Sequence, residues 1–393
     1  MKVQGMVWMV CMVLWLFPCR ANAAVHGICL GTVTGEHEWS QWLDDFDSAE
    51  IEAFLNSLQE KGVPELSFGE IMEELLAGNL MGVFERGAEM VKTVLFSELR
   101  TNSGLLGQIV ILAVIGAVFS GFAGIFSSGH VSETGFYVVY LLAMAFLAAS
   151  FFSSVTIASE VMNDLLAFMQ VLLPAYFMAV AVAGGAITSA AVCGFTIGVI
   201  GLIQSVFGQI LLPVMRIYMM LVLAGNLYKE EMLSKLTELL GNAVLWACKT
   251  MFGVVIGFHV IQGMVLPQAD ALKNASAMRL AQMIPGIGGG ASAVSQMVLG
   301  SGILIKNTAG AAAVVILLLL AAVPVVKLTV LMVLYYLASA AMQPVCDKRM
   351  VACMSGTAAA HGILLKIVGY SLALFVATIA IICVSTNAVW YAG

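Results

Sequence analysis

The sequence predicts an all-α, polytopic helical membrane protein, on the evidence of its composition, its apolar segments and the start of the chain. The 393 residues are 61% hydrophobic and 10% charged, with a mean hydropathy of +1.00. A soluble domain carries about 25% charged residues. The apolar segments run for roughly 16 to 25 residues without alternation, which is typical of spanning helices and not of the ~10-residue strands of a barrel.

The first 23 residues have the pattern of a secretory signal peptide. Lys2 precedes an apolar run from Met6 to Phe17, and Ala21 and Ala23 then form an A-x-A cleavage site. The apolar run is shorter than the ~20 residues that a bilayer needs. We expect cleavage after Ala23 rather than an uncleaved anchor, which would place the following segment outside the cytoplasm.

Residues 24–100 are predicted to form a small, acidic, exported helical segment. They hold 15 of the 23 acidic residues and four basic ones, a net charge of −11. Apolar residues recur at helical spacing on either side of Gly62-Val63-Pro64, and Ser67 stands three residues before Glu70, as in a capping box. Such short amphipathic helices are expected to pack on the membrane domain or on a partner. The acidic residues indicate a solvated helix face, with a binding face as the alternative.

Residues 101–393 are predicted to form the membrane domain, with seven to nine spanning segments. The longest apolar segment, Thr308–Met342, would be about 52 Å long as one helix, longer than the ~30 Å hydrocarbon layer. We therefore expect it to break at Pro324. The other predicted segments are Gly104–Phe126, Gly135–Ile157, Leu165–Ala183, Ile187–Leu212, Pro213–Tyr228, Ala243–Leu266 and Ile363–Ser385.

An internal repeat is predicted from a shift of 111 residues. This shift places Pro174 on Pro285, Pro213 on Pro324 and Arg216 on Lys327. Recurrence at a fixed spacing is the sequence signature of duplication. The repeat units would lie near 104–212 and 213–322, with a partial copy at 324–385.

Two proline- and glycine-marked stretches hold matching positions in this repeat. No strand precedes them and no G-K-[ST] follows, so they do not fit a phosphate-binding loop. One interpretation is a pair of broken helices that line a path; the other, which we favour, is tight helix packing through small residues. The candidate residues are Pro174, Gly184, Gly185, Pro285, Gly286, Gly288, Gly289 and Gly290.

Charged residues inside the apolar region are candidates for function, because a charge in a bilayer is costly. Arg216 and Lys327 each follow a repeat proline by three residues, where the helix dipole disfavours a cation. We favour the interpretation that both side chains extend to the membrane surface. The alternative is that they pair with Glu160, Asp164 or backbone carbonyls inside the protein.

Signatures of an enzyme are missing from the sequence. The five histidines form no H-E-x-x-H, and there is no G-x-S-x-G or Walker A pattern. The cysteines lack metal-site spacing. We expect a protein that is not an enzyme and that holds no catalytic residue, cofactor or metal ion.

The stretch from Ala281 to Pro344, together with the signal sequence and the acidic exported segment, resembles the stage III sporulation protein AE family of endospore-forming bacteria. The resemblance implies a multi-pass protein of the mother-cell membrane around the forespore, with residues 24–100 extracytoplasmic. It also implies that the protein is part of a channel or "feeding tube" apparatus, with the other subunits of that complex as partners. We expect no nucleic-acid partner.

Two function classes stay open. In the first, the chain is a permease-like subunit whose repeat forms a path. In the second, it is a structural membrane platform that recruits ring-forming partners and does not itself conduct. No transported small molecule follows from the sequence.

Overall fold

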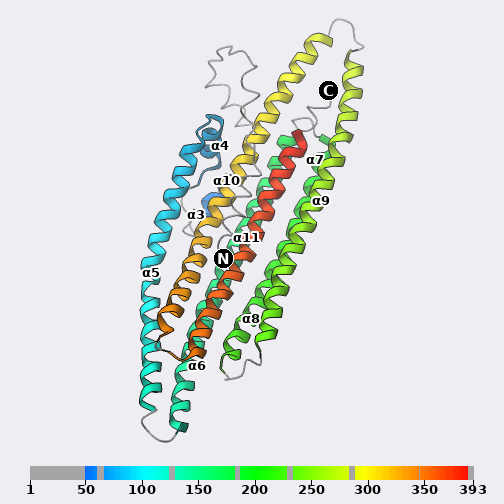
Figure 1. The fold of residues 1–393 in the computed structure, drawn as a ribbon. Coiled ribbons are helices and arrows are strands. Elements are labelled where there is room, and N and C mark those ends of the chain that lie inside the picture. The colour runs from blue at the N-terminus through cyan, green and yellow to red at the C-terminus, as the bar shows by residue number, and fades with distance from the viewer. Residues whose placement is uncertain are drawn as a thin grey trace. The chain divides into compact units, whose positions relative to one another are not determined.

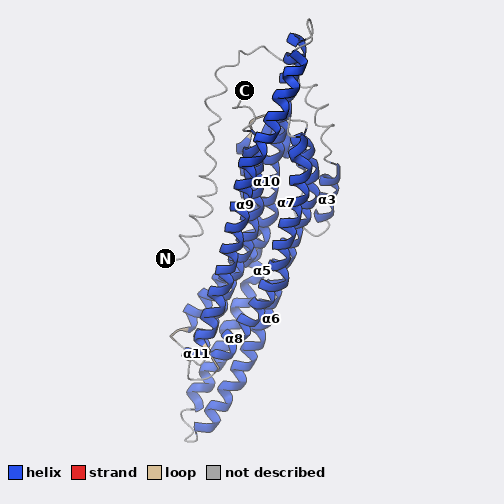
Figure 2. Ribbon diagram, turned by 90° about the vertical axis from the view of Figure 1, so that its right-hand side faces the viewer, coloured by secondary structure: helices blue, strands red, loops and turns tan. Residues whose placement is uncertain are grey.

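The computed structural model describes residues 49–59, 66–123, 129–181, 186–227, 233–282, 288–344 and 346–387. The predicted signal peptide and residues 24–48 lie outside this part of the chain. Within it, every regular element is a helix and no strand occurs, as Figure 2 shows. The predicted all-α class is confirmed.

Two short helices precede a set of long ones that run side by side (Figure 1). α10 packs against α11, α5 and α6, and α11 also contacts α9 and α8. The helices are α3 (Ala49–Gln59), α4 (Phe68–Leu76), α5 (Leu80–Ala123), α6 (Gly129–Val180), α7 (Ala186–Val206), the π-helical turn η2 (Phe207–Leu211), α8 (Leu212–Gly225), α9 (Ser234–Gln282), α10 (Gly288–Met342) and α11 (Lys348–Asn387).

Five stretches of the described residues are long and apolar enough to cross a membrane. The protein is therefore a multi-pass membrane protein. The five stretches are Tyr137–Val180, Val192–Gly225, Ser234–Gln262, Gly302–Met342 and Lys348–Val384.

The helices are longer than the sequence predicted, because prolines do not end them. The prediction that α10 breaks at Pro324 is wrong: the helix continues from Gly288 to Met342. In the same way α6 continues through Pro174 and joins two predicted spans. A proline removes one backbone hydrogen bond and crowds the preceding turn. Both helices pack against several other helices, and prolines are tolerated in membrane helices where neighbouring groups satisfy the freed backbone.

Pro213 is accommodated differently, by a widened turn that precedes it. The backbone N–H of Leu212 donates to the carbonyl of Phe207, five residues back, which closes η2. Pro213 follows as the second residue of α8, where a missing N–H is tolerated. α7, η2 and α8 therefore succeed one another without a loop.

The predicted repeat stays a prediction. Pro285 lies outside the described residues, so the first pair of prolines cannot be compared. In the second pair, Pro213 lies just after the π turn and Pro324 inside an uninterrupted α-helix.

The short helices α3 and α4 pack on the long ones, as predicted. Ser67 caps α4 by accepting a hydrogen bond from the N–H of Glu70, and Glu52 of α3 accepts from Ser67 and from the N–H of Gly69. The Phe54 ring lies 6.2 Å from that of Phe168 on α6. The apolar side chains buried by the two helices are Ile51, Leu55, Leu58, Phe68, Ile71 and Met72.

Candidate functional site

A charged pair joins α5 to α10. Lys327 Nζ lies 3.4 Å from Oε1 of Glu98, and both side chains are only partly exposed. Glu98 belongs to the stretch that sequence reasoning assigned to the exported segment. Since α5 continues across residue 100, that segment and the membrane domain share one helix. The sequence did not indicate that Glu98 is the partner of Lys327. Its only related signal was the helical spacing of the residues that form α5.

The other predicted intramembrane charges lie elsewhere. Arg216 is exposed on α8 and Glu160 is exposed on α6, whereas Asp164 is half buried on α6. The carboxylate recorded beside Lys327 is therefore Glu98 and not Glu160 or Asp164. A functional role for these charges stays a prediction.

The predicted helix breaks are described only in part. Residues 182–185 and 283–287, which include Gly184, Gly185, Pro285 and Gly286, lie outside the described residues. Gly288, Gly289 and Gly290 form the start of α10. Whether these stretches line a path or only pack tightly stays open.

A buried hydrogen-bonded cluster joins α6, α10 and α11, and sequence reasoning missed it. His361 of α11 has Nε2 3.0 Å from Oγ of Ser154 and Nδ1 2.9 Å from the carbonyl of Thr357. The hydroxyls of Ser150 and Tyr335 lie 2.5 Å apart beside it. Ring centroids of Phe151 and Tyr335 both lie 5.1 Å from that of His361.

The geometry assigns the tautomer of His361. The carbonyl of Thr357 can only accept, so Nδ1 carries the hydrogen and Nε2 of the neutral ring is an acceptor. The hydroxyl hydrogen of Ser154 is shared between Nε2 and the carbonyl of Ser150, which lies 3.1 Å from the hydroxyl oxygen. The cluster is thereby satisfied without a charge in the apolar core. A histidine among apolar residues, four positions after Thr357, was the available sequence signal.

A second buried contact joins α6, α7 and α11. Gln204 donates through Nε2 to the carbonyl of Met162 at 2.7 Å and accepts at Oε1 from the Ser371 hydroxyl at 3.0 Å. Nearer the start of α10, Lys306 is completely buried, and the adjacent Asn307 accepts a hydrogen bond from the Cys383 thiol at 3.2 Å. These polar groups lie where helices meet, so they fix helix positions.

The described residues contain no group of three His, Cys, Asp or Glu side chains that could hold a metal ion. What they contain is a set of interhelical hydrogen bonds and the partly buried ion pair between Lys327 and Glu98. Such an arrangement can orient helices and tolerate polar groups at membrane depth.

Comparison with known proteins gives a consistent result. The family model of stage III sporulation protein AE matches residues 66–386. Stage III sporulation protein AE of Bacillus subtilis (strain 168) is 23% identical over 296 residues, which cover 74% of this chain and 73% of that protein. No solved structure matches.

Proposed function

The chain belongs to the stage III sporulation protein AE family, and from this premise we propose that it is a membrane subunit of the channel apparatus between mother cell and forespore. The apparatus is required for endospore formation. The subunit lies in the mother-cell membrane around the forespore, with residues 24–100 outside the cytoplasm. Its partners are the other subunits of the complex and the bilayer, and it acts neither on nucleic acid nor as an enzyme.

The observation that carries this proposal is the match of the family model to most of the chain. The described residues of the chain also include five helices that are long and apolar enough to span a membrane. The long helices add support. At 1.5 Å per residue, α6 and α10 are each about 80 Å long, more than twice the hydrocarbon thickness. Helices of this length extend beyond one membrane surface and give partners a rigid surface to bind.

Within this role we favour a permease-like subunit over a platform. The permease-like role is supported by polar groups at helix contacts, notably the His361 cluster and the Lys327–Glu98 pair. A platform needs no buried polar network, because apolar packing would suffice. The transported species is not specified by these residues.

Deletion of the gene in a spore-forming host tests the role. We expect the deletion strain to complete engulfment but to form no heat-resistant spores, and the wild-type gene should restore them. A fluorescent fusion of the protein should gather at the membrane around the forespore. Normal spore formation without the gene would contradict the proposal.

Cysteine accessibility separates the two mechanisms. Single cysteines along 184–194 and 285–302 should react with a charged thiol reagent if these stretches line a path. If they only pack, they should stay protected while the strain still sporulates, and the platform would be the better account.

A further inference from the structure

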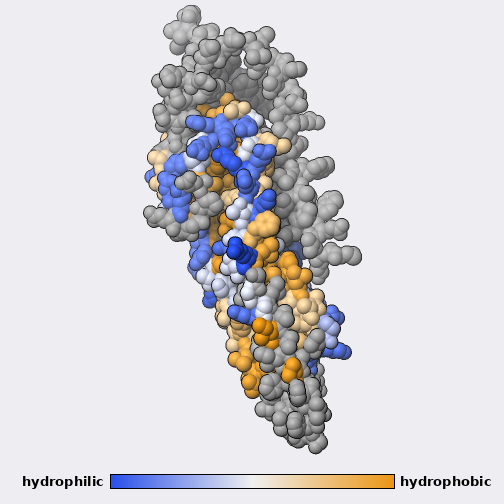
Figure 3. Space-filling model, turned by 90° about the vertical axis from the view of Figure 1, so that its left-hand side faces the viewer, coloured by the Kyte–Doolittle hydropathy of each residue, from blue (hydrophilic) through white to orange (hydrophobic). Residues whose placement is uncertain are grey.

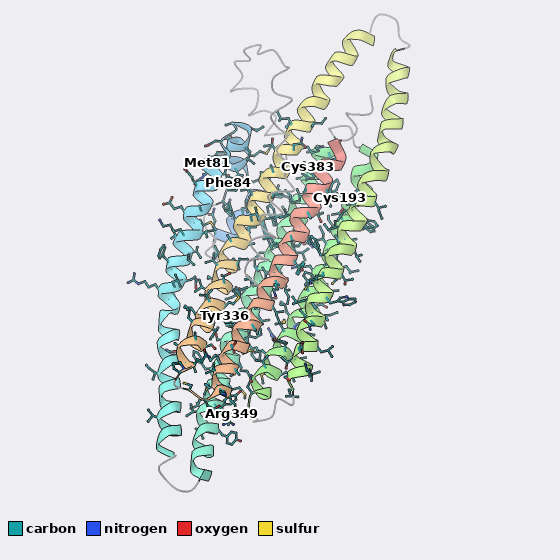
Figure 4. The ribbon with its side chains drawn as sticks, viewed as in Figure 1. Met81, Phe84, Cys193, Tyr336, Arg349 and Cys383 are labelled. Atoms are coloured by element: carbon teal, nitrogen blue, oxygen red, sulfur yellow. The ribbon has the colours of Figure 1, made fainter. Side chains whose placement is uncertain are left out.

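Three polar side chains are buried on α7, α9 and α11, within stretches that are apolar enough to cross a membrane. Thr196 of α7 and Thr378 of α11 are completely buried, and His259 of α9 is 2% exposed. Cys193, labelled in Figure 4, lies three residues before Thr196 and locates this region in the upper half of the view. Hydrophilic side chains of the α5 side lie instead on the surface, as Figure 3 shows. The three buried groups therefore depend on hydrogen-bond partners inside the protein.

A stacked aromatic pair brings Thr196 and His259 to one level. The rings of Phe195 on α7 and Phe258 on α9 lie 4.5 Å apart, and both are exposed. The two helices run in opposite directions (Figure 1). One step along each right-handed helix therefore turns the next side chain toward the same side of the contact. That next residue is Thr196 on α7 and His259 on α9, and because both are buried, both turn inward from the aromatic pair.

Thr378 lies opposite Thr196 on the third helix. The Ser371 hydroxyl of α11 donates to Oε1 of Gln204 on α7 at 3.0 Å, and these two helices run in opposite directions (Figure 1). Thr196 stands eight residues before the glutamine, and Thr378 stands seven residues after the serine. Both are therefore roughly 11 Å, or two helical turns, from that hydrogen bond in the same direction.

A contact between α9 and α11 gives the same register. The rings of Phe252 on α9 and Tyr370 on α11 lie 6.0 Å apart, and these two helices run in the same direction (Figure 1). His259 follows the phenylalanine by seven residues and Thr378 follows the tyrosine by eight, so both stand two turns further along. Two independent contacts thus place the three polar groups at one level inside the bundle.

Two of the three groups carry a polar atom for which the described residues supply no hydrogen bond. These atoms are Oγ1 of Thr196 and Nε2 of His259. Gln262 also interacts with the imidazole ring, but Nε2 stays without a hydrogen bond. The Thr378 hydroxyl donates to the carbonyl of Leu374 at 2.8 Å and can still accept. An unpaired polar atom in an apolar interior is costly, so two of them on facing helices indicate one small molecule that bonds to both.

We propose that Thr196, His259 and Thr378 form an internal binding site for a water molecule that joins α7, α9 and α11. Two hydroxyls and a neutral imidazole supply both donors and acceptors without a charge, which suits a neutral ligand. Three hydrogen bonds are also the usual number for a buried water. The site ties α9 to the polar contacts that Gln204 makes with α6 and α11. The inference goes beyond the proposed channel role and does not depend on it.

Isosteric replacement tests whether the Thr196 hydroxyl is bonded to a ligand. Thr196→Val keeps the shape of the side chain and removes the hydroxyl. If a bound water pairs with this hydroxyl, the full-length variant in nanodiscs should have a lower Tm than the wild type. Removal of a hydroxyl that truly lacks a partner would relieve its cost and raise the Tm. A Tm that is unchanged or higher would overturn the proposal.

A double-mutant cycle tests whether one molecule serves both groups. His259→Leu, combined with Thr196→Val, should lower the Tm by less than the sum of the two single effects, because either change already weakens the shared ligand. Thr357→Val is the matched control, since Thr357 is also completely buried but its hydroxyl donates to the carbonyl of Cys353. Its effect should add to that of His259→Leu. Additive effects in both pairs would overturn the proposal.

Hydroxyl-radical footprinting of the wild-type protein in native membranes tests for the water itself. X-ray pulses split water into hydroxyl radicals, which oxidise the side chains next to a bound water. His259 should be oxidised several-fold faster than His361, which is equally buried but has protein hydrogen-bond partners at both ring nitrogens. Equal rates would overturn the proposal, including the case in which a variant fails to fold. None of these readouts requires transport, so failure of the channel role would leave them unchanged.

Discussion

Gly356 on α11 lies against Val222 on α8 so closely that a Cβ at position 356 would overlap Cγ1 of the valine. Val222 is buried and β-branched, so its side chain has little freedom to move aside. Gly356→Ala should therefore push the two helices apart. We expect a loss of about 1–3 kcal/mol in stability, measured as a lower Tm of the protein in detergent or nanodiscs.

Gly369→Ala on the same helix is the control for this prediction. A Cβ at Gly369 would meet no atom within 4 Å, and alanine favours a helix over glycine by roughly 0.5–1 kcal/mol. This variant should be as stable as the wild type or slightly more stable. If both variants behave alike, the α8–α11 contact is not as close as described.

The Ser154 hydroxyl is predicted to stabilise the cluster around His361. Ser154→Ala leaves Nε2 of a buried ring without a hydrogen bond, which costs about 1–3 kcal/mol. Ser154→Thr keeps the hydroxyl, and Ser153→Ala changes an exposed neighbour. A Tm that falls for Ser154→Ala but not for the other two would support the cluster, whereas three equal values would contradict it.

The helical class and the packing of α3 and α4 could be predicted, because they follow from hydropathy and from helical spacing of apolar residues. The Ser67 cap could also be predicted, because it depends on a local pattern in which Ser67 stands three residues before Glu70. The continuation of α10 through Pro324 could not be predicted, because proline is a local signal and neighbouring helices decide its effect.

The candidate site was predictable only as a set of residue types. Lys327 stood out as a charge in an apolar segment, but its partner Glu98 lies on a helix that begins in the acidic stretch. The Ser154–His361 contact joins positions 207 residues apart. Which faces meet depends on how the helices are placed around one another, and a single sequence does not carry that information.

The course of the helices predicts the side of the membrane on which the chain ends. α5, α6, the α7–α8 pair, α9, α10 and α11 run in alternating directions (Figure 1). If each crosses once, the C-terminal end lies on the same side as residues 24–100. Alkaline phosphatase fused after Arg100, or to the C-terminus, should be active, and fused after Asp347 it should be inactive. The Asp347-Lys348-Arg349 turn would then be cytoplasmic, as positive residues favour. Activity at all three positions would refute this topology.

The last prediction concerns the two cations that share a position in the predicted repeat. Replacing Lys327 by Met keeps the length of the side chain, removes its charge and leaves Glu98 without this partner. Arg216→Met removes a charge from an exposed position on α8. If these charges serve function, both variants should accumulate and insert normally but lower the yield of heat-resistant spores.

The Glu98–Lys327 pair can be tested separately from charge alone. Glu98→Lys combined with Lys327→Glu restores an ion pair of reversed polarity and should recover spore yield, whereas each single reversal should not. Because both side chains are partly exposed, the pair itself should add less than about 1 kcal/mol to stability, so the Tm should change little. Reduced yield at unchanged Tm would point to function. Normal yield from the Arg216→Met, Lys327→Met double variant would show that both cations serve only to reach the membrane surface.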